Sequence, residues 1–102
     1  MTAVVKMMVL PHAQDLALPS SELAAGLDLV AAVPAGSPVV ITPGRRTAIP
    51  TGLAIDLPTG TEAQIRSRSG LVLHHGVVVL GAPQTVDARY LGELHVILAN
   101  WR

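Results

Sequence analysis

The sequence predicts an all-β fold, and three observations support this prediction. Short apolar segments rich in valine, leucine and isoleucine alternate with turns that contain glycine and proline. The turn signals recur about every 8–12 residues, a spacing typical of a β-sandwich or β-barrel rather than of βαβ units. The sequence shows no repeat, linker or low-complexity segment. We therefore expect a single compact β domain that occupies residues 1–102.

Composition narrows the class of protein further. Half of the 102 residues are hydrophobic and 14% are charged, and the apolar residues are almost all aliphatic, with one Trp, one Tyr and no Phe. A small chain with so little charge is expected to bury part of its surface against another copy of itself. The net charge of zero argues against a nucleic-acid-binding protein, which relies on phosphate neutralisation. The absence of cysteine excludes disulfides and thiolate metal sites.

The first strand is expected at residues 3–10. Pro11 ends it, because proline has no backbone N–H to donate to a sheet. The same apolar patch lacks the features of a signal peptide, and no run approaches the roughly 20 residues that span a bilayer. We therefore expect a cytoplasmic protein without a membrane partner. Residues 12–24 form a loop, in which Ser20, Ser21 and Glu22 suit either a short helix cap or an extended approach.

The remaining strands follow in order between turn signals. Residues 27–33 are expected to form the second strand, which the proline- and glycine-containing stretch 34–38 ends. Pro43-Gly44 is a predicted tight reversal, and Pro50-Thr51 and Pro58-Thr59-Gly60 are predicted turns between later strands. Applying the same criteria along the whole chain, we expect the later strands at residues 39–42, 45–49, 52–57, 62–65, 71–73 with 77–80, and 94–98.

Two polar islands, residues 66–70 and 81–92, interrupt the last apolar runs. As turns, they can present backbone and side-chain groups to a ligand. Arg68, Ser69 and Gly70 offer a guanidinium, a hydroxyl and an unhindered amide, which together suit phosphate oxygens. In the second island Asp87 is the only acidic residue before Glu93, and a carboxylate can orient and activate a water molecule.

Three short motifs occur in order along the chain. They are Ala25-Gly26-Leu27-Asp28-Leu29, then Arg68-Ser69-Gly70-Leu71 with Gly76, then Thr85-Val86-Asp87 with Tyr90, Gly92 and Glu93. At this spacing they resemble motifs of the deoxyuridine triphosphatase (dUTPase) family, whose members split dUTP into dUMP and pyrophosphate. The resemblance extends to residue 98 and implies a distorted jelly-roll β-barrel or sandwich. It also implies a fold incomplete at the C-terminus, because the family's fourth and fifth motifs have no counterpart before residue 102.

The resemblance also implies a role for individual residues. Asp87 would orient the water that attacks the α-phosphorus, Tyr90 would pack against the deoxyribose, and Asp28 would help to hold Mg²⁺ through water. Arg68, Ser69 and Gly70 would contact the triphosphate. The further substrate contacts would come from Gly81, Thr85, Val86 and His95. As in the family, the nucleotide would be dUTP or a related deoxynucleotide, the cofactor Mg²⁺, and the assembly a homotrimer.

The sequence departs from the family at the hairpin that recognises uracil. Gly81 replaces an asparagine and Gln84 replaces a glycine, while Ser67 stands where a proline usually precedes the arginine. These observations leave three hypotheses. The first is a Mg²⁺-dependent dUTP diphosphatase, and the alternative is a non-catalytic scaffold that binds nucleotides or self-assembles. The third is a dCTP deaminase, which shares the fold, but Gly70 and Tyr90 argue against it.

Overall fold

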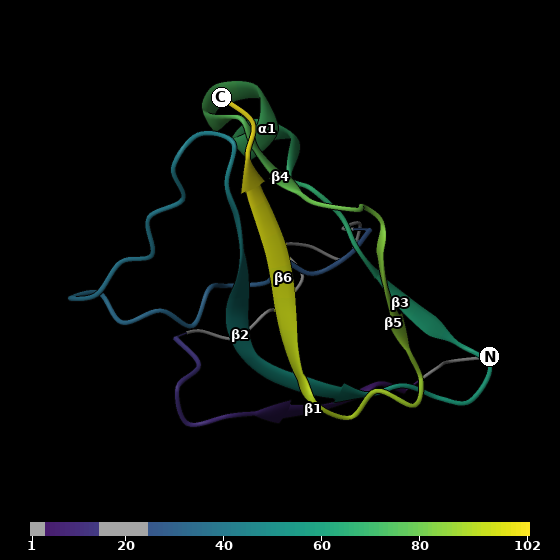
Figure 1. The fold of residues 1–102 in the computed structure, drawn as a ribbon. Coiled ribbons are helices and arrows are strands. Elements are labelled where there is room, and N and C mark those ends of the chain that lie inside the picture. Colours follow the sequence, from purple (N-terminus) through teal and green to yellow (C-terminus); the bar gives the residue numbers. More distant parts are fainter. Residues whose placement is uncertain (1–3, 15–24) are drawn as a thin grey trace.

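The computed structural model describes residues 4–14 and 25–102 of the chain (Figure 1). Apart from one short helix, its regular elements are strands. In chain order, the elements are β1 (Lys6–Val9), β2 (Arg46–Asp56), β3 (Glu62–Ile65), α1 (Ser69–His75), β4 (Val77–Val79), β5 (Gln84–Asp87) and β6 (Glu93–Asn100). In the described parts of the chain, no helix is long and apolar enough to cross a membrane.

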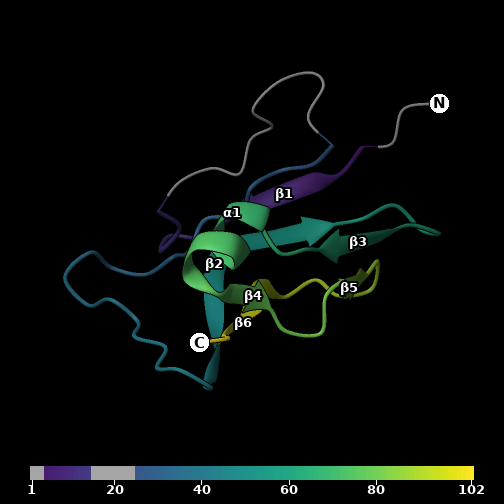
Figure 2. The ribbon, with the colours of Figure 1, turned by 90° about the horizontal axis from the view of Figure 1, so that it is seen from above.

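The strands form two antiparallel sheets. The larger has the order β1-β2-β6-β4, and the smaller is the β3–β5 pair. The long strands β2 and β6 run side by side through the molecule, and the β3–β5 pair lies apart from them (Figures 1 and 2). All the pairings that define these sheets are antiparallel, which excludes a βαβ arrangement for this part of the chain.

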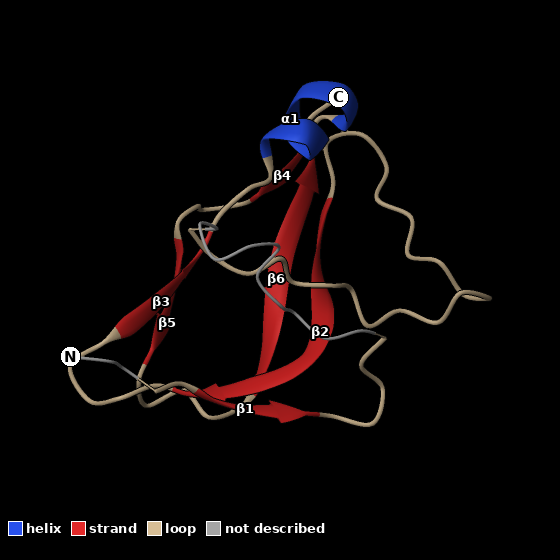
Figure 3. Cartoon of the chain, turned by 180° about the vertical axis from the view of Figure 1, so that it is seen from behind, coloured by secondary structure: helices blue, strands red, loops and turns tan. Residues whose placement is uncertain are grey.

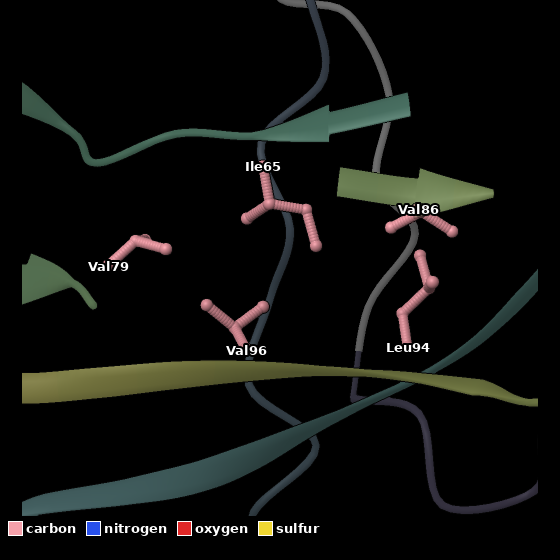
Figure 4. Packing of buried hydrophobic residues seen from close by; sticks show 5 residues of the cluster. All are labelled: Ile65, Val79, Val86, Leu94 and Val96. Carbon is pink, nitrogen blue, oxygen red and sulfur yellow. The ribbon is translucent and has the colours of Figure 1, made fainter. Parts of the chain in front are cut away.

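The hydrophobic core lies between the two sheets. Ile65 from β3 and Val86 from β5 point toward Leu94 and Val96 from β6, and Val79 from β4 closes one side (Figure 4). Alternation explains why these residues meet, because Leu94 and Val96 are buried while their neighbour His95 is exposed. The core is thus built by side chains from four strands, β3, β4, β5 and β6.

Strand β2 bends at an irregularity between Pro50 and Ala54, where its register with β6 shifts. Its first part pairs with β6, and its last four residues pair with β1. Gly52, at the bend, has a φ of +70°, and a β-carbon there would lie 2.5 Å from the α-carbon of Ala13. The bend therefore requires glycine, and it allows one strand to serve two neighbours.

The predicted turn at Pro50-Thr51 is wrong, because β2 runs through it. Pro50 needs no ladder hydrogen bond from its own nitrogen at this position, and its carbonyl accepts the N–H of Ala32 at 2.8 Å. Thr51 is buried, and its hydroxyl donates to the carbonyl of Leu94 at 2.8 Å. At this position the chain therefore bends within β2, at the irregularity, and does not reverse direction.

Two further predicted strands, residues 27–33 and 39–42, are wrong. The structure assigns no strand to either segment, although Ala32 is buried and Leu29 packs against the core. Among the described residues, one hydrogen bond joins each segment to the sheet. The N–H of Ala32 bonds to Pro50, and the side chain of Asn100 donates to the carbonyl of Ile41 at 2.8 Å. Pro34 follows the first segment, Pro38 and Pro43 flank the second, and proline has no N–H to donate to a ladder. The predicted choice at residues 20–22 lies outside the described residues.

The predicted strand at residues 71–73 is also wrong, since these residues form helix α1 (Figure 3). Gly76 ends the helix in the left-handed conformation, with a φ of 67°, and its N–H bonds to the carbonyl of Val72. No residue of α1 is buried, so no core contact selects an extended conformation for these apolar side chains. Residues 84–87, predicted as part of a turn, form β5 because they pair with β3.

The other strand predictions are confirmed within one or a few residues. Strands β1, β3 and β4 fall in the predicted segments 3–10, 62–65 and 77–80, and β6 contains the predicted segment 94–98. The predicted strands 45–49 and 52–57 are joined as the single strand β2. Among the described residues, the strands form two sheets that do not close into a barrel, in agreement with the prediction of an all-β fold that is incomplete.

Candidate functional site

The Arg68–Gly70 turn connects β3 to β4 through helix α1. Arg68 has an extended backbone immediately before the helix, and its carbonyl accepts the N–H of Val72 at 3.1 Å. Ser69 and Gly70 occupy the first helical turn, whose amides have no partner within the helix. All three residues are exposed. The turn therefore presents a guanidinium, a hydroxyl and backbone N–H groups to solvent, which is the donor set expected for phosphate.

Asp28 lies beside this turn. Its Oδ2 is 3.9 Å from Nη2 of Arg68, and both side chains are about two-thirds exposed (65% and 63%). The first two motifs, 40 residues apart in sequence, thus meet in space. An exposed ion pair at this distance adds little to stability. The two side chains can therefore separate, and each can then bind a ligand.

Asp87 ends strand β5 at a surface hollow lined by Thr59, Gly60, Thr61, Ala88 and Arg89. Its side chain is exposed, and in the strand register it stands opposite Glu62. Two carboxylates in register repel one another, while Arg89 brings a positive charge to the same hollow. The hollow therefore holds an accessible carboxylate beside hydroxyl groups and a guanidinium.

A turn fixes Tyr90 relative to Asp87. The N–H of Tyr90 bonds to the carbonyl of Asp87 at 3.0 Å, and its hydroxyl donates to the carbonyl of Glu93 at 2.7 Å. The ring covers Gly92, where a β-carbon would come within 3.0 Å of the tyrosine hydroxyl. Glycine at this position lets the ring lie flat against the loop, so the tyrosine is held in one orientation while 46% of it remains exposed.

The other predicted substrate contacts are distributed around β5 and β6. Val86 is buried in the core, so only its backbone can face a ligand, whereas Thr85 is exposed. Gly81 is exposed with a φ of +76°, and His95 lies on the exposed side of β6. The structure brings His95 close to Gln84, whose side chain donates to the His95 carbonyl at 2.9 Å.

Glu93 forms a cluster that the sequence analysis did not predict. Its Oε2 lies 2.7 Å from Nε2 of His12 and accepts the N–H of Gly52 at 2.9 Å, and its Oε1 lies 4.0 Å from Nε2 of His95. The hydrogen bond with His12 holds the pKa of the Glu93 carboxyl below its ordinary value. No local pattern reveals this cluster, because His12 and Glu93 are 81 positions apart.

The site residues fall into two groups. Asp28 forms an ion pair with Arg68, and the Asp87 carbonyl accepts the N–H of Tyr90. Within residues 4–14 and 25–102, no hydrogen bond or ion pair connects these two groups. Helix α1 and the C-terminal end of β5 lie at opposite ends of the β3–β5 region (Figures 1 and 3). Within these same ranges, no three histidine, aspartate or glutamate side chains gather as a metal site would require.

The fold and the two polar groups define a jelly-roll β domain with two separate polar turns, one that exposes a guanidinium and hydroxyl group and one that exposes a carboxylate. The sequence model of the dUTPase family matches residues 12–102. The chain therefore belongs to the dUTPase family. This confirms the resemblance inferred from the three motifs.

Individual relatives agree with this assignment. The chain is 53% identical over 93 residues to a deoxyuridine 5′-triphosphate nucleotidohydrolase from Mesorhizobium japonicum, an alignment that covers 89% of this chain and 58% of the relative. The chain thus spans less than two-thirds of that protein's length.

Solved structures of phage dUTPases share the fold. A mutant dUTPase from phage phi11 of Staphylococcus aureus, described for its coordination of a structural Mg(II) ion, matches with a TM-score of 0.83 and 26% identity. The match covers 95% of this chain and 60% of that one. A mutant dUTPase of Staphylococcus bacteriophage 80alpha with dUpNHpp matches with a TM-score of 0.85 and 25% identity, over 99% of this chain and 56% of that one. The prediction of an all-β, dUTPase-like jelly roll is confirmed.

Proposed function

We propose that the chain is a dUTP diphosphatase in which Asp87 supplies the water-activating carboxylate and residues 68–70 form a phosphate-binding turn. The observation that supports this most directly is the Asp87–Tyr90 turn. It exposes a carboxylate at the end of β5 and holds an aromatic ring three residues away in a fixed orientation. Membership of the dUTPase family supplies the substrate, dUTP, and the products, dUMP and pyrophosphate.

In the proposed reaction, Asp87 accepts a hydrogen bond from a water molecule and takes its proton as the water attacks the α-phosphorus. The bond from that phosphorus to the bridging oxygen breaks, and pyrophosphate leaves. Arg68, Ser69 and Gly70 bind the phosphate oxygens, because a guanidinium and backbone amides are the donors best suited to a charged, multi-oxygen group. Tyr90 packs against the deoxyribose and excludes a 2′-hydroxyl by contact.

The proposed cofactor is Mg²⁺, and the residues present fit it. Magnesium retains several of its waters and is usually held by one or two carboxylates together with substrate phosphates. Asp28 offers one exposed carboxylate 3.9 Å from Arg68, in the same place as the proposed phosphate donors. When bound, the ion would supply positive charge that neutralises the triphosphate. Asp28 would orient its water shell.

The separation of the two polar groups suggests how the complete site forms. Asp87 ends β5 and Arg68 immediately precedes α1, and these two elements lie at opposite ends of the β3–β5 region (Figures 1 and 3), whereas a triphosphate must reach both at once. We propose that the groups come together between copies of the chain in a homotrimer. The proposal of a cytoplasmic homotrimer and of a single domain over residues 1–102 rests on the family resemblance and on composition.

The test is pyrophosphate release from dUTP by the purified chain, with dCTP, dTTP and UTP as competing substrates, with and without Mg²⁺. Selective release that requires Mg²⁺ and disappears in Asp87→Asn is expected. Asp56→Asn is the matched control, since Asp56 is also an exposed aspartate at the end of a strand. Binding of nucleotides by a folded chain that releases no pyrophosphate would instead favour the alternative of a non-catalytic scaffold.

A further inference from the structure

Strand β6 has one edge that the sheet covers only in part. Its edge away from β2 pairs with β4 at residues 98–100, and the ladder ends when the N–H of Leu80 bonds to the carbonyl of Ile97 at 2.9 Å. Beyond this point, side chains replace strand partners. Gln84 bonds to the backbone of His95 and Ile97, and the Tyr90 hydroxyl caps the carbonyl of Glu93.

The carboxamide of Gln84 contacts this edge at two points. Its Nε2 donates to the carbonyl of His95 at 2.9 Å, and its Oε1 accepts the N–H of Ile97 at 3.4 Å. A planar group with a donor next to an acceptor is therefore bound to two successive backbone groups of β6, in the manner of a peptide from an added strand. The edge is thus a recognition surface for such a group, and the chain's own glutamine holds it.

The position of this edge relates it to the proposed reaction. Gln84 begins β5 and Asp87 ends it, so the occupied edge lies next to the strand that carries the proposed water-activating carboxylate. Uracil is a planar ring that presents an N3–H donor beside carbonyl acceptors. Like the glutamine carboxamide, uracil therefore has a donor beside an acceptor. Its N3–H can donate to the His95 carbonyl, and its neighbouring carbonyl can accept the Ile97 N–H.

We propose that Gln84 is an internal competitor for the base, occupying the edge of β6 that uracil would pair with and thereby weakening recognition of the deoxyuridine moiety. The inference rests on the proposed function for the identity of the base. Gln84 has no positive φ, so its backbone suits any residue and its side chain can be shortened without strain. The side chain must leave the edge before a base can bind.

The experiment titrates the nucleoside deoxyuridine into the isotope-labelled chain and follows the backbone amide of Ile97 by NMR. Deoxyuridine carries no phosphate, so the result does not depend on Arg68 or Asp87. In Gln84→Ala, and in Gln84→Ser as a second shortened variant, we expect the dissociation constant to fall by about tenfold, the size expected for removing competition by two neutral hydrogen bonds. Gln64→Ala is the matched control, because this exposed glutamine lies on β3 and bonds only to Arg66 among the side chains of the described residues.

The ligand 3-methyldeoxyuridine checks the chemistry, since methylation removes the N3–H donor. The gain in the Gln84 variants should disappear with this ligand. Equal deoxyuridine affinities for the original chain and for folded Gln84→Ala would overturn the inference, as would a gain that 3-methyldeoxyuridine shares. A chain that releases no pyrophosphate from dUTP, yet binds deoxyuridine about tenfold more tightly once Gln84 is shortened, would overturn the proposed hydrolysis and support the inference.

Discussion

The carboxylate of Glu93 accepts the backbone N–H of Gly52 at 2.9 Å, which ties the first residue of β6 to the bend in β2. The same Oε2 atom lies 2.7 Å from Nε2 of His12, in the segment that follows β1. One carboxylate therefore joins three parts of the chain at the point where β2 changes partner.

His12→Ala is expected to weaken the dependence of stability on acid pH. The hydrogen bond with His12 is the main reason that the pKa of Glu93 lies below its ordinary value of 4.5. A lowered carboxyl pKa contributes stability that is present above the ordinary value and is lost as the pH falls through the folded-state value. Urea unfolding at pH 7, 5 and 3 should show a smaller acid loss in His12→Ala than in the original chain. His74→Ala, on the exposed face of α1, is the control. Identical pH profiles for the two variants would contradict the prediction.

Gly52→Ala is expected to destabilise the fold by more than about 2 kcal/mol, because backbone strain at positive φ alone costs about 1–3 kcal/mol. The added β-carbon would also lie 2.5–2.8 Å from the Ala13 atoms. Gly44→Ala is the matched control, since Gly44 has a φ of +78° but nothing within 4 Å of the β-carbon position. Both variants carry the backbone strain of a positive φ, and only Gly52→Ala adds a steric clash with Ala13. Urea unfolding compares their free energies of unfolding, and equal decreases would show that Ala13 moves aside freely.

Thr51→Val is expected to lower the free energy of unfolding by about 1–3 kcal/mol, the cost of leaving buried polar groups without partners. The buried hydroxyl of Thr51 donates to the Leu94 carbonyl at 2.8 Å and accepts the Leu53 N–H at 3.2 Å. Valine keeps the shape and removes both bonds. Thr47→Val, earlier in β2 and half-buried, is the comparison in thermal or urea unfolding. A loss no greater than that of Thr47→Val would mean that the irregularity in β2 does not depend on the hydroxyl.

Leu94→Ala is expected to lower the free energy of unfolding by about 2–5 kcal/mol, as large-to-small changes do in packed cores. Leu94 is 4% exposed and packs with Val86 and Val96 between the sheets. Leu91→Ala removes the same atoms from a side chain that is 65% exposed, and it should change stability little. The free energies of unfolding of both variants, measured by chemical denaturation, test whether the core between β6 and the β3–β5 pair stabilises the fold.

The sequence was most informative where apolar and polar residues alternate between clear turn signals. The residues 94–98 and 62–65 satisfied both conditions, and their strands were predicted closely. The prediction failed at residues 71–73, where branched and leucine side chains suggested a strand but nothing buries them. It failed at Pro50 because the bend there depends on Gly52 and on contacts with Ala13 and Glu93, which local sequence does not contain.

For the candidate site, short motifs identified the residues but not their neighbours. The spacing of Asp87 and Tyr90 predicted a turn, and the turn exists. Two contacts depend on how segments distant in sequence pack. These are the approach of Asp28 to Arg68 and the hydrogen bond from the Gln84 amide to β6. The contact of His12 with Glu93 depends on the same packing, since these residues meet only after β1, β2 and β6 have paired.

The pairing of β2 with β6 also sets an order of events for a newly made chain. Its partners are separated by 53 residues for Arg46 with Ala99 and by 39 for Ala54 with Glu93, so most of the chain must be present before this pair can form. Such non-local topologies fold slowly. Until β6 leaves the ribosome, the apolar interior of β2 has only the short β1 to pair with. Molecular chaperones that shield exposed strands should therefore have their longest opportunity to act between the emergence of residue 56 and the emergence of residue 100 from the ribosome.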